Sequence, residues 1–195
     1  HGCLDPLNRL LDALDLRADD ELVFLGDYVD RGPDTPGVIA RLVELERQRP
    51  GTTFLRGNHD AMMMDFLGLS DDGFGESYLI ESNGGHTTLL QYGCPPAIVD
   101  KYIETMTVPT GNERRMLLKA IPPAHIDFLL RTELFKLTPE YLFVHTGINP
   151  AKSSNEQSVD DLLWIREKFV NRPHNLPQTI IYGHSPTYDR GFDVR

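Results

Sequence analysis

Four short, strand-like stretches of this 195-residue chain each end in a cluster of polar residues. The stretches cover residues 21–25, 52–55, 141–144 and 179–182, and their length is typical of buried strands rather than helices. Functional residues gather at the carboxyl ends of parallel strands, so the clusters predict an active edge of a sheet. They read Gly-Asp-Tyr-Val-Asp-Arg-Gly at 26–32, Arg-Gly-Asn-His-Asp at 56–60, His-Thr-Gly at 145–147 and Gly-His-Ser-Pro at 183–186.

Helical patterns separate these stretches. Leucines at helical spacing after Asp5-Pro6 predict a helix over about 6–16, and Thr35-Pro36 begins a second helix that ends near residue 49. This alternation predicts parallel β-α-β units, with the first strand buried on both faces. Residues 60–132 show several short helical patterns and predict a helical insert. Ser158 and Asp161 match a capping box at the start of a later helix.

Composition excludes several classes of protein. A formal net charge of −10 argues against a nucleic-acid-binding surface, which needs clustered Lys and Arg. No apolar run is long enough to span a membrane, and no targeting signal is evident. Two cysteines, Cys3 and Cys94, indicate a reduced cytoplasmic protein rather than a disulfide framework. The length predicts one globular domain over residues 1–195.

The order of the four clusters is similar to the signature of the phosphoprotein phosphatases, which are calcineurin-like metallophosphoesterases. The first two clusters are highly specific, and the resemblance covers essentially the whole chain. Segments 83–85, 144–147 and 163–166 resemble the bacterial and phage branch, which includes lambda phosphatase and the symmetrical diadenosine tetraphosphatases. The resemblance implies an α/β fold with a central β-sandwich flanked by helices, the helical insert lying between the second and third clusters.

The resemblance also assigns metal ligands position by position. Asp27 matches the aspartate that bridges two metals, and His1 matches a ligand of the first. Asn58, His145 and His184 match the ligands of the second. This mixed oxygen and nitrogen set suits manganese, iron or zinc. The resemblance therefore implies two divalent metal ions, manganese foremost, that activate a water for direct attack on phosphorus.

Two further groups of residues match the catalytic parts of the family. His59 matches the general acid and Asp30 its partner, since a carboxylate on one ring nitrogen orients an imidazole. Arg31, Arg56 and Arg166 match the arginines that bind phosphate, because a guanidinium pairs two phosphate oxygens at once. The alternative from the residues alone is that Asp30 caps a turn and His59 is structural.

The resemblance also shows where the sequence departs from the family. The family pattern opens with Gly-Asp-x-His-Gly, of which His1-Gly2 supplies the last two positions, so we expect the natural protein to continue beyond both His1 and Arg195. Three mild departures affect no predicted ligand: Asp60 in place of the commoner Glu, Thr146 in place of Ala or Gly, and Ser185 in place of Thr.

The leading functional prediction is a serine/threonine protein phosphatase acting on phosphorylated proteins or peptides. The alternative is a symmetrical bis(5'-nucleosyl)-tetraphosphatase, in which the same metal core serves another substrate. An alternative of a different class is a decayed homologue that only binds phosphate as a regulatory module. His86, His125 and His174 lie outside the clusters and are interpreted as solvated or capping residues. No oligomeric state is predicted.

Overall fold

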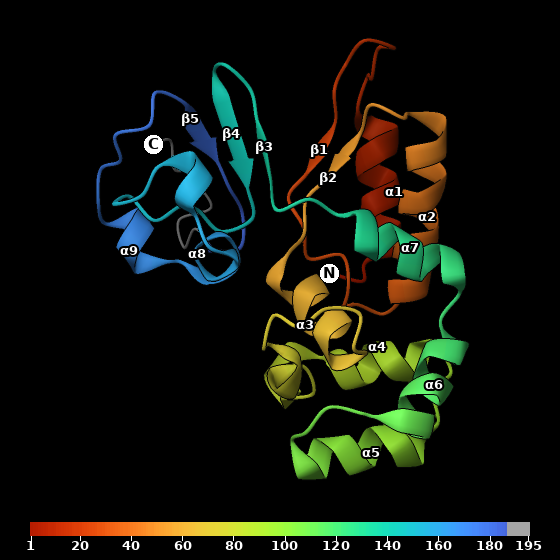
Figure 1. Cartoon of the computed structure of the whole chain (residues 1–195). Helices are drawn as coiled ribbons and strands as arrows, with labels where there is room; N and C mark the ends of the chain where they lie inside the picture. Colours follow the sequence, from red (N-terminus) through yellow and green to blue (C-terminus); the bar gives the residue numbers. More distant parts are fainter. Residues whose placement is uncertain (187–195) are drawn as a thin grey trace. The chain divides into compact units, whose positions relative to one another are not determined.

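The computed structural model describes residues 1–186 and is shown in Figure 1. Its contacts divide the chain into two compact units. Unit 1 comprises residues 1–22, 27–52 and 59–131, whereas unit 2 comprises residues 23–26, 53–58 and the chain from residue 132 onward. The helices from α1 to α7 belong mainly to unit 1, and all the strands belong to unit 2.

Two helices from the start of the chain pack together in unit 1. Helix α1 (Leu4–Ala13) lies beside α2 (Thr35–Gln48), as Figure 1 shows. The Asp34 carboxylate caps α2 by accepting a hydrogen bond from the Gly37 N–H at 2.8 Å. Pro36 stands in the first turn, where its missing N–H costs nothing. Helix α2 also contacts α7 (Pro123–Arg131) and α4 (Gly85–Gln91), so three helices cover its apolar side.

The chain between residues 58 and 131 consists of short helices joined by loops. Helix α3 (Asn58–Phe66) follows the second polar cluster, and its methionines Met62, Met63 and Met64 are all buried. Three consecutive buried residues show that α3 is covered by protein on all sides rather than along one stripe. The remaining elements are η1 (Gly75–Ser77), η2 (Glu81–Asn83), α4 (Gly85–Gln91), α5 (Pro96–Thr105) and α6 (Gly111–Ala120).

Within residues 1–186, unit 2 contains two small sheets. Strand β1 (Val23–Phe24) pairs in parallel with β2 (Thr53–Phe54), with Val23 opposite Thr53. In the second sheet β4 (Tyr141–Val144) is central, antiparallel to β3 (Phe135–Leu137) and parallel to β5 (Thr179–Ile181). A bridge between Leu55 and Glu133 links the residue after β2 to the approach to β3.

Helices α8 (Val159–Trp164) and α9 (Glu167–Val170), preceded by η3 (Ser154–Glu156), complete unit 2. Their apolar side chains pack with those of β4 and β5 in one buried cluster. Burial of this cluster stabilises the strand ends that carry the polar residues. The cluster consists of Leu142, Val144, Ile148, Leu162, Ile165, Phe169 and Ile180.

The predicted α/β fold class is confirmed, with small sheets and flanking helices, and the parallel β-α-β start is also confirmed. The capping box at Ser158 and Asp161 forms as predicted. Several boundaries were wrong: the first helix begins at Leu4, and the first two strands are only two residues long. The first strand is half-buried rather than buried on both faces, and β3 was not predicted.

The interpretation of one histidine outside the polar clusters was also wrong. His125 is buried on α7 rather than solvated or capping, and its Nδ1 lies 3.1 Å from the Tyr92 hydroxyl. Burial lowers the pKa of His125, because the charged imidazolium is poorly solvated there.

Among the described residues, no helix has the length and apolarity needed to cross a membrane.

Asp161 anchors the loop that follows the His-Thr-Gly cluster. Its carboxylate accepts hydrogen bonds from Ser158 Oγ at 2.8 Å and Asn149 Nδ2 at 3.1 Å, and it pairs with the Lys152 ammonium. Burial alone would raise the pKa of Asp161, but the hydrogen bonds from Lys152, Ser158 and Asn149 outweigh it and lower the pKa to about 2.

We expect Asp161→Asn to destabilise the protein by about 2.5 kcal/mol at pH 7, since a pKa shift from 3.8 to about 2 corresponds to roughly this free energy. A lowered folded-state pKa gives stability that is present above the ordinary value of 3.8 and is lost as the pH falls toward 2. The difference in the free energy of unfolding between wild type and variant should therefore become smaller below pH 4. Urea unfolding of both proteins between pH 7 and pH 3 measures it, and a gap independent of pH would contradict the assignment.

Candidate active site

His1 and Asp27 form a metal-donor pair in unit 1. Nδ1 of His1 lies 2.9 Å from the Val29 carbonyl oxygen, which only accepts, so Nδ1 carries the proton in the neutral ring. Nε2 then presents a lone pair, and it lies 3.4 Å from Asp27 Oδ2. The Arg31 guanidinium donates to the same Nε2 at 3.3 Å. Two electron-pair donors that face one another in this way provide a fitting place for a cation.

The predicted catalytic pair is also formed in unit 1. Nδ1 of His59 lies 2.7 Å from Asp30 Oδ2, and the two residues are 2% and 0% exposed. A carboxylate at Nδ1 fixes the ring so that Nε2 is the nitrogen that can carry a proton to a substrate. Burial raises the pKa of Asp30, and the hydrogen bond and charge of His59 oppose that rise. This contact supports the prediction that Asp30 is the partner of His59, rather than the alternative in which Asp30 only caps a turn.

Asp60 holds the backbone of the first polar cluster, a role that the sequence did not reveal. Its fully buried carboxylate accepts hydrogen bonds from three consecutive N–H groups: Asp27 at 2.8 Å, Tyr28 at 3.0 Å and Val29 at 3.4 Å. The Asp27 carboxylate in turn accepts from the His59 N–H at 3.1 Å. The start of α3 and the first cluster are thereby joined through two carboxylates.

The backbone of the site is strained. Positive φ is uncommon for residues with a side chain, and it persists where surrounding contacts enforce it. Among residues 1–186, five residues other than glycine adopt it, and four of them are predicted site residues. These four are Asp27 (62°), Asp30 (72°), Arg31 (58°) and His184 (61°).

Tyr78 and Thr88 surround the other oxygen of Asp30. The Tyr78 hydroxyl donates to Asp30 Oδ1 at 3.1 Å, and the Thr88 hydroxyl donates to the same oxygen at 2.8 Å. Thr88 Oγ1 also accepts from the Asp30 N–H at 3.1 Å. Burial and the nearby Asp30 carboxylate raise the pKa of Tyr78 well above its usual range, so its hydroxyl keeps the proton that it donates.

Unit 2 contains the second predicted ligand group. Nδ1 of His145 lies 2.6 Å from the Leu25 carbonyl oxygen, which assigns the proton to Nδ1 and a lone pair to Nε2. Nε2 faces Asn58 Oδ1 at 3.0 Å, and the ring centroid of His184 lies 5.1 Å from that of His145. The three predicted ligands Asn58, His145 and His184 are therefore brought together.

The three predicted phosphate-binding arginines have different surroundings. Arg31 lies in unit 1 beside His1, whereas Arg56 and Arg166 lie in unit 2. Thr132 orients Arg56 by accepting from Nε at 3.1 Å and from Nη2 at 3.2 Å. Arg166 donates from Nε to His184 Nε2 at 2.8 Å, so it contacts a predicted metal ligand. Their phosphate-binding role stays a prediction.

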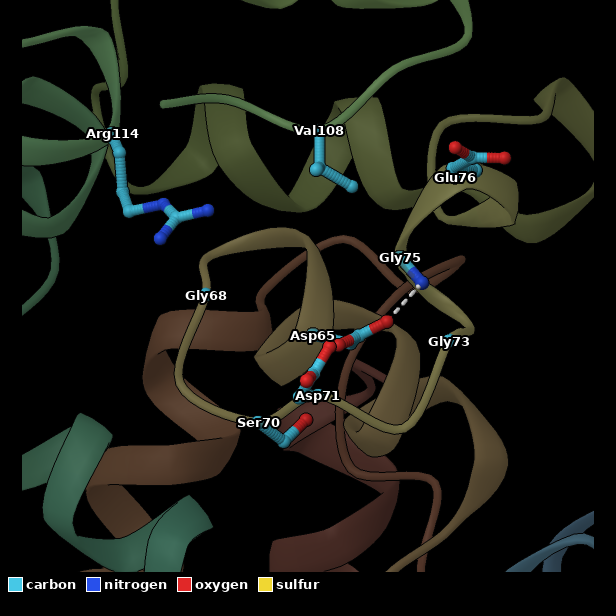
Figure 2. Close-up of a pocket in the computed structure, with 9 residues that line it drawn as sticks. All are labelled: Asp65, Gly68, Ser70, Asp71, Gly73, Gly75, Glu76, Val108 and Arg114. Carbon is cyan, nitrogen blue, oxygen red and sulfur yellow. Dashed lines mark hydrogen bonds between the residues drawn. The ribbon is translucent and has the colours of Figure 1, made fainter. Parts of the chain in front are cut away.

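A pocket of about 580 Å³ lies elsewhere in unit 1 and contains none of the predicted site residues. Figure 2 shows its lining residues, among which the Asp65 carboxylate accepts from the Gly75 N–H at 2.6 Å and so closes the loop after α3. Asp65 therefore serves the loop, and the pocket is not the site that the sequence predicts. The pocket is lined by Asp65, Gly68, Ser70, Asp71, Gly73, Gly75, Glu76, Val108 and Arg114.

The donor atoms in unit 1 fit a divalent metal ion. One ligand atom each from His1, Asp27 and His59 lies within 4.8 Å of the others. Imidazole and carboxylate donors of this kind bind manganese, iron or zinc, and a carbonyl hydrogen bond at the far nitrogen of His1 is the usual support for a ligating histidine. These donors define a candidate metal site within the α/β fold.

The comparison with known families agrees. Residues 1–194 match the family described as calcineurin-like phosphoesterase. The chain is also 38% identical to serine/threonine-protein phosphatase 1 of Salmonella typhimurium over 193 residues, covering 95% of this chain and 75% of that protein. This chain belongs to the calcineurin-like phosphoesterase family, whose members use divalent metals.

Two other similarities are more limited. A symmetrical bis(5'-nucleosyl)-tetraphosphatase of Legionella pneumophila is 43% identical over 67 residues, which are 34% of this chain and 23% of that protein. The chain thus matches about a quarter of the length of that relative. A solved structure with a provisional assignment as a diadenosine tetraphosphatase has a TM-score of 0.59 at 20% identity, covering 94% of this chain and 71% of the other. This structure supports the fold.

Proposed function

We propose that this chain is a metal-dependent phosphomonoesterase that acts on phosphoserine and phosphothreonine in proteins or peptides. The observation that carries the proposal is the buried contact between His59 and Asp30, which lies in the same unit as the donor pair His1 and Asp27. A general acid is needed to expel an alkoxide such as the serine oxygen, because an alkoxide is a poor leaving group. The long match to a protein phosphatase supports the substrate class.

The proposed metal content is two divalent ions, manganese foremost with iron or zinc as alternatives. His1 and Asp27 would hold one ion, and Asn58, His145 and His184 the other; the bridging role of Asp27 stays a prediction. When bound, such ions supply Lewis acidity and an activated water. Metal binding needs an imidazole nitrogen with a free lone pair, and the carbonyl contacts at Nδ1 of His1 and His145 leave Nε2 as that nitrogen in the neutral ring.

The chain's own residues would perform the remaining steps. Water oxygen attacks phosphorus, the bond from phosphorus to the serine oxygen breaks, and Nε2 of His59 gives its proton to that oxygen. Asp30 holds the ring at Nδ1 throughout. Arg31, Arg56 and Arg166 are proposed to pair with phosphate oxygens, for which the guanidinium geometry is suited.

The second candidate is symmetrical cleavage of a dinucleoside tetraphosphate. It is favoured by the local similarity to the Legionella tetraphosphatase. Both candidates share the acid and the metal donors, so they differ in the surface that binds the rest of the substrate. The decayed, phosphate-binding module is disfavoured, since a fully buried polar pair such as His59 and Asp30 is costly to retain without use.

The proposal is tested by removing metal with a chelator and restoring it with manganese, iron or zinc, each at a saturating concentration. We expect turnover of a phosphoserine peptide to be lost on chelation and restored by manganese. Diadenosine tetraphosphate is assayed alongside, with product analysis. Preferential formation of two nucleoside diphosphates would establish the second candidate, and metal binding without turnover of either substrate would establish the binding module.

Localisation and partners are part of the same proposal. Cys3 and Cys94 are both free thiols, which a reducing compartment favours, so we propose a cytoplasmic protein. The proposed partner is a phosphorylated protein or peptide, with no nucleic acid and no membrane, in keeping with the net charge of −10.

A further inference from the structure

We propose that Tyr78 and Thr88 are positioning residues: they hold the carboxylate of Asp30 and, through it, the imidazole of His59 in the orientation that proton donation requires. This inference rests on the proposed phosphomonoesterase function. It assigns a role to residues 77–88, a segment that includes the Asn-Gly-Gly motif at 83–85. The proposed catalytic steps use no residue of this segment directly.

The hydrogen bonds around Asp30 are divided between its two oxygens. Oδ2 accepts a hydrogen bond from Nδ1 of His59 at 2.7 Å. Oδ1 accepts hydrogen bonds from the hydroxyls of Tyr78 at 3.1 Å and Thr88 at 2.8 Å. With one oxygen held by two donors, rotation of the carboxylate about its χ2 angle is restricted. The direction of the remaining oxygen, and therefore the plane of the His59 ring, is fixed as a result.

Thr88 also acts on the backbone of Asp30. Its Oγ1 accepts from the Asp30 N–H at 3.1 Å, in a residue whose φ is 72°. The single hydroxyl proton of Thr88 is directed to Asp30, so the Thr35 hydroxyl, 3.3 Å away, donates to Thr88 Oγ1. Thr88 thus binds both the backbone and the side chain of Asp30, and both contacts are lost if the hydroxyl is removed.

The glycines of segment 77–88 permit this close approach. Gly84 has a φ of 81°, and a Cβ there would lie 2.9 Å from the backbone nitrogen of Arg31. A Cβ on Gly85 would lie 2.8 Å from the Tyr78 ring and 2.5 Å from its carbonyl oxygen. Asn83 closes the loop by donating from Nδ2 to the Ser77 carbonyl at 2.8 Å. The Asn-Gly-Gly motif therefore lets α4 and its Thr88 pack directly against Tyr78 and the first polar cluster.

The kinetic test uses variants that remove only the hydroxyls. In Tyr78→Phe and in Thr88→Val we expect kcat for a phosphoserine peptide to fall about 10-fold, with KM unchanged, since a hydrogen bond to a charged group is lost. For 4-nitrophenyl phosphate, whose leaving group needs little protonation, the loss should stay below about threefold. A merely structural role would lower both rates equally, and that result would overturn the proposal.

Two controls separate positioning from loss of stability. Tyr92→Phe removes the hydroxyl of another buried tyrosine, which contacts His125 instead of Asp30, and should leave both rates unchanged. Thr88→Ser retains a hydroxyl and should recover most of the activity lost in Thr88→Val. If Tyr78→Phe fails to fold, the comparison of Thr88→Ser with Thr88→Val still decides the matter.

A double-variant comparison tests the route through His59. Once His59→Asn has removed the acid, Tyr78→Phe should cause no further loss of kcat, because residues that act through one group are not additive. A further 10-fold loss in the His59→Asn background would show that Tyr78 acts independently of His59, against the proposal.

A readout independent of activity keeps the inference separate from the proposed function. In ¹⁵N-histidine NMR of the metal-free protein, the Nδ1 proton of His59 should give a signal protected from exchange and absent in His59→Asn. We expect Tyr78→Phe and Thr88→Val to increase its exchange rate at least about 10-fold, and Tyr92→Phe to leave it unchanged. An unaltered signal in both variants would overturn the inference even if the enzyme is active, and altered exchange would support it even without peptide turnover.

Discussion

His59→Asn should lower kcat for a phosphoserine peptide by about 10²- to 10⁴-fold, the range that general acid catalysis supplies. The reason is that the serine oxygen would then leave as an unprotonated alkoxide. KM should change little, because the lost interaction acts on the leaving group in the transition state. For 4-nitrophenyl phosphate the loss should be clearly smaller. Steady-state kinetics at saturating metal measure both substrates.

The control for this variant addresses a second possible role of His59. One of its ring nitrogens lies within the unit 1 donor group, so metal affinity must be measured as well. Unchanged affinity in His59→Asn assigns the loss to proton transfer, whereas weakened binding would make His59 a ligand and contradict its assignment as the acid. His86→Asn, at the start of α4 and outside the site, should retain full activity.

Asp60→Ala should destabilise the protein by about 3 kcal/mol or more. The change leaves three backbone N–H groups of the first polar cluster without the acceptor that binds them, in a position that is fully buried. The positive φ of Asp27 would lose one of its supports, so metal binding should weaken as well. Urea unfolding and a manganese titration measure the two effects.

Asp71→Ala provides the matched control for Asp60→Ala, because Asp71 is an exposed carboxylate in the same unit. It should change the free energy of unfolding by less than about 0.5 kcal/mol. An Asp60→Ala protein as stable as Asp71→Ala would show that water replaces the buried carboxylate, and the structural role assigned to Asp60 would be wrong.

The local sequence pattern predicted which helices and strands exist better than it predicted their first and last residues. Helix α2 and strand β4 were predicted within about one residue, because a capping Thr-Pro pair and a compact apolar run mark them. Strand β3 was missed, since Phe135–Leu137 has no turn signal or alternation that distinguishes it from a loop. Its pairing with β4 defines it, and that contact is tertiary.

The sequence by itself determined the family and supplied a predicted inventory of the site. Its polar clusters follow short strands in an order that resembles the family signature, and that resemblance named the candidate donors His1, Asp27, Asn58, His145 and His184 and the candidate pair His59 and Asp30 by position. The residue types agree with these candidate roles, because metal coordination and proton transfer each require particular atoms.

Only the tertiary structure decided what supports that inventory. Asp60 reaches back over 31 to 33 residues to the first cluster, and Thr88 reaches Asp30 across 58. Such hydrogen bonds follow no sequence period, and a buried tyrosine or threonine looks the same in the sequence whether its hydroxyl is used or not. Their partners are set by how α3, α4 and the first cluster pack, because packing decides which buried polar groups meet.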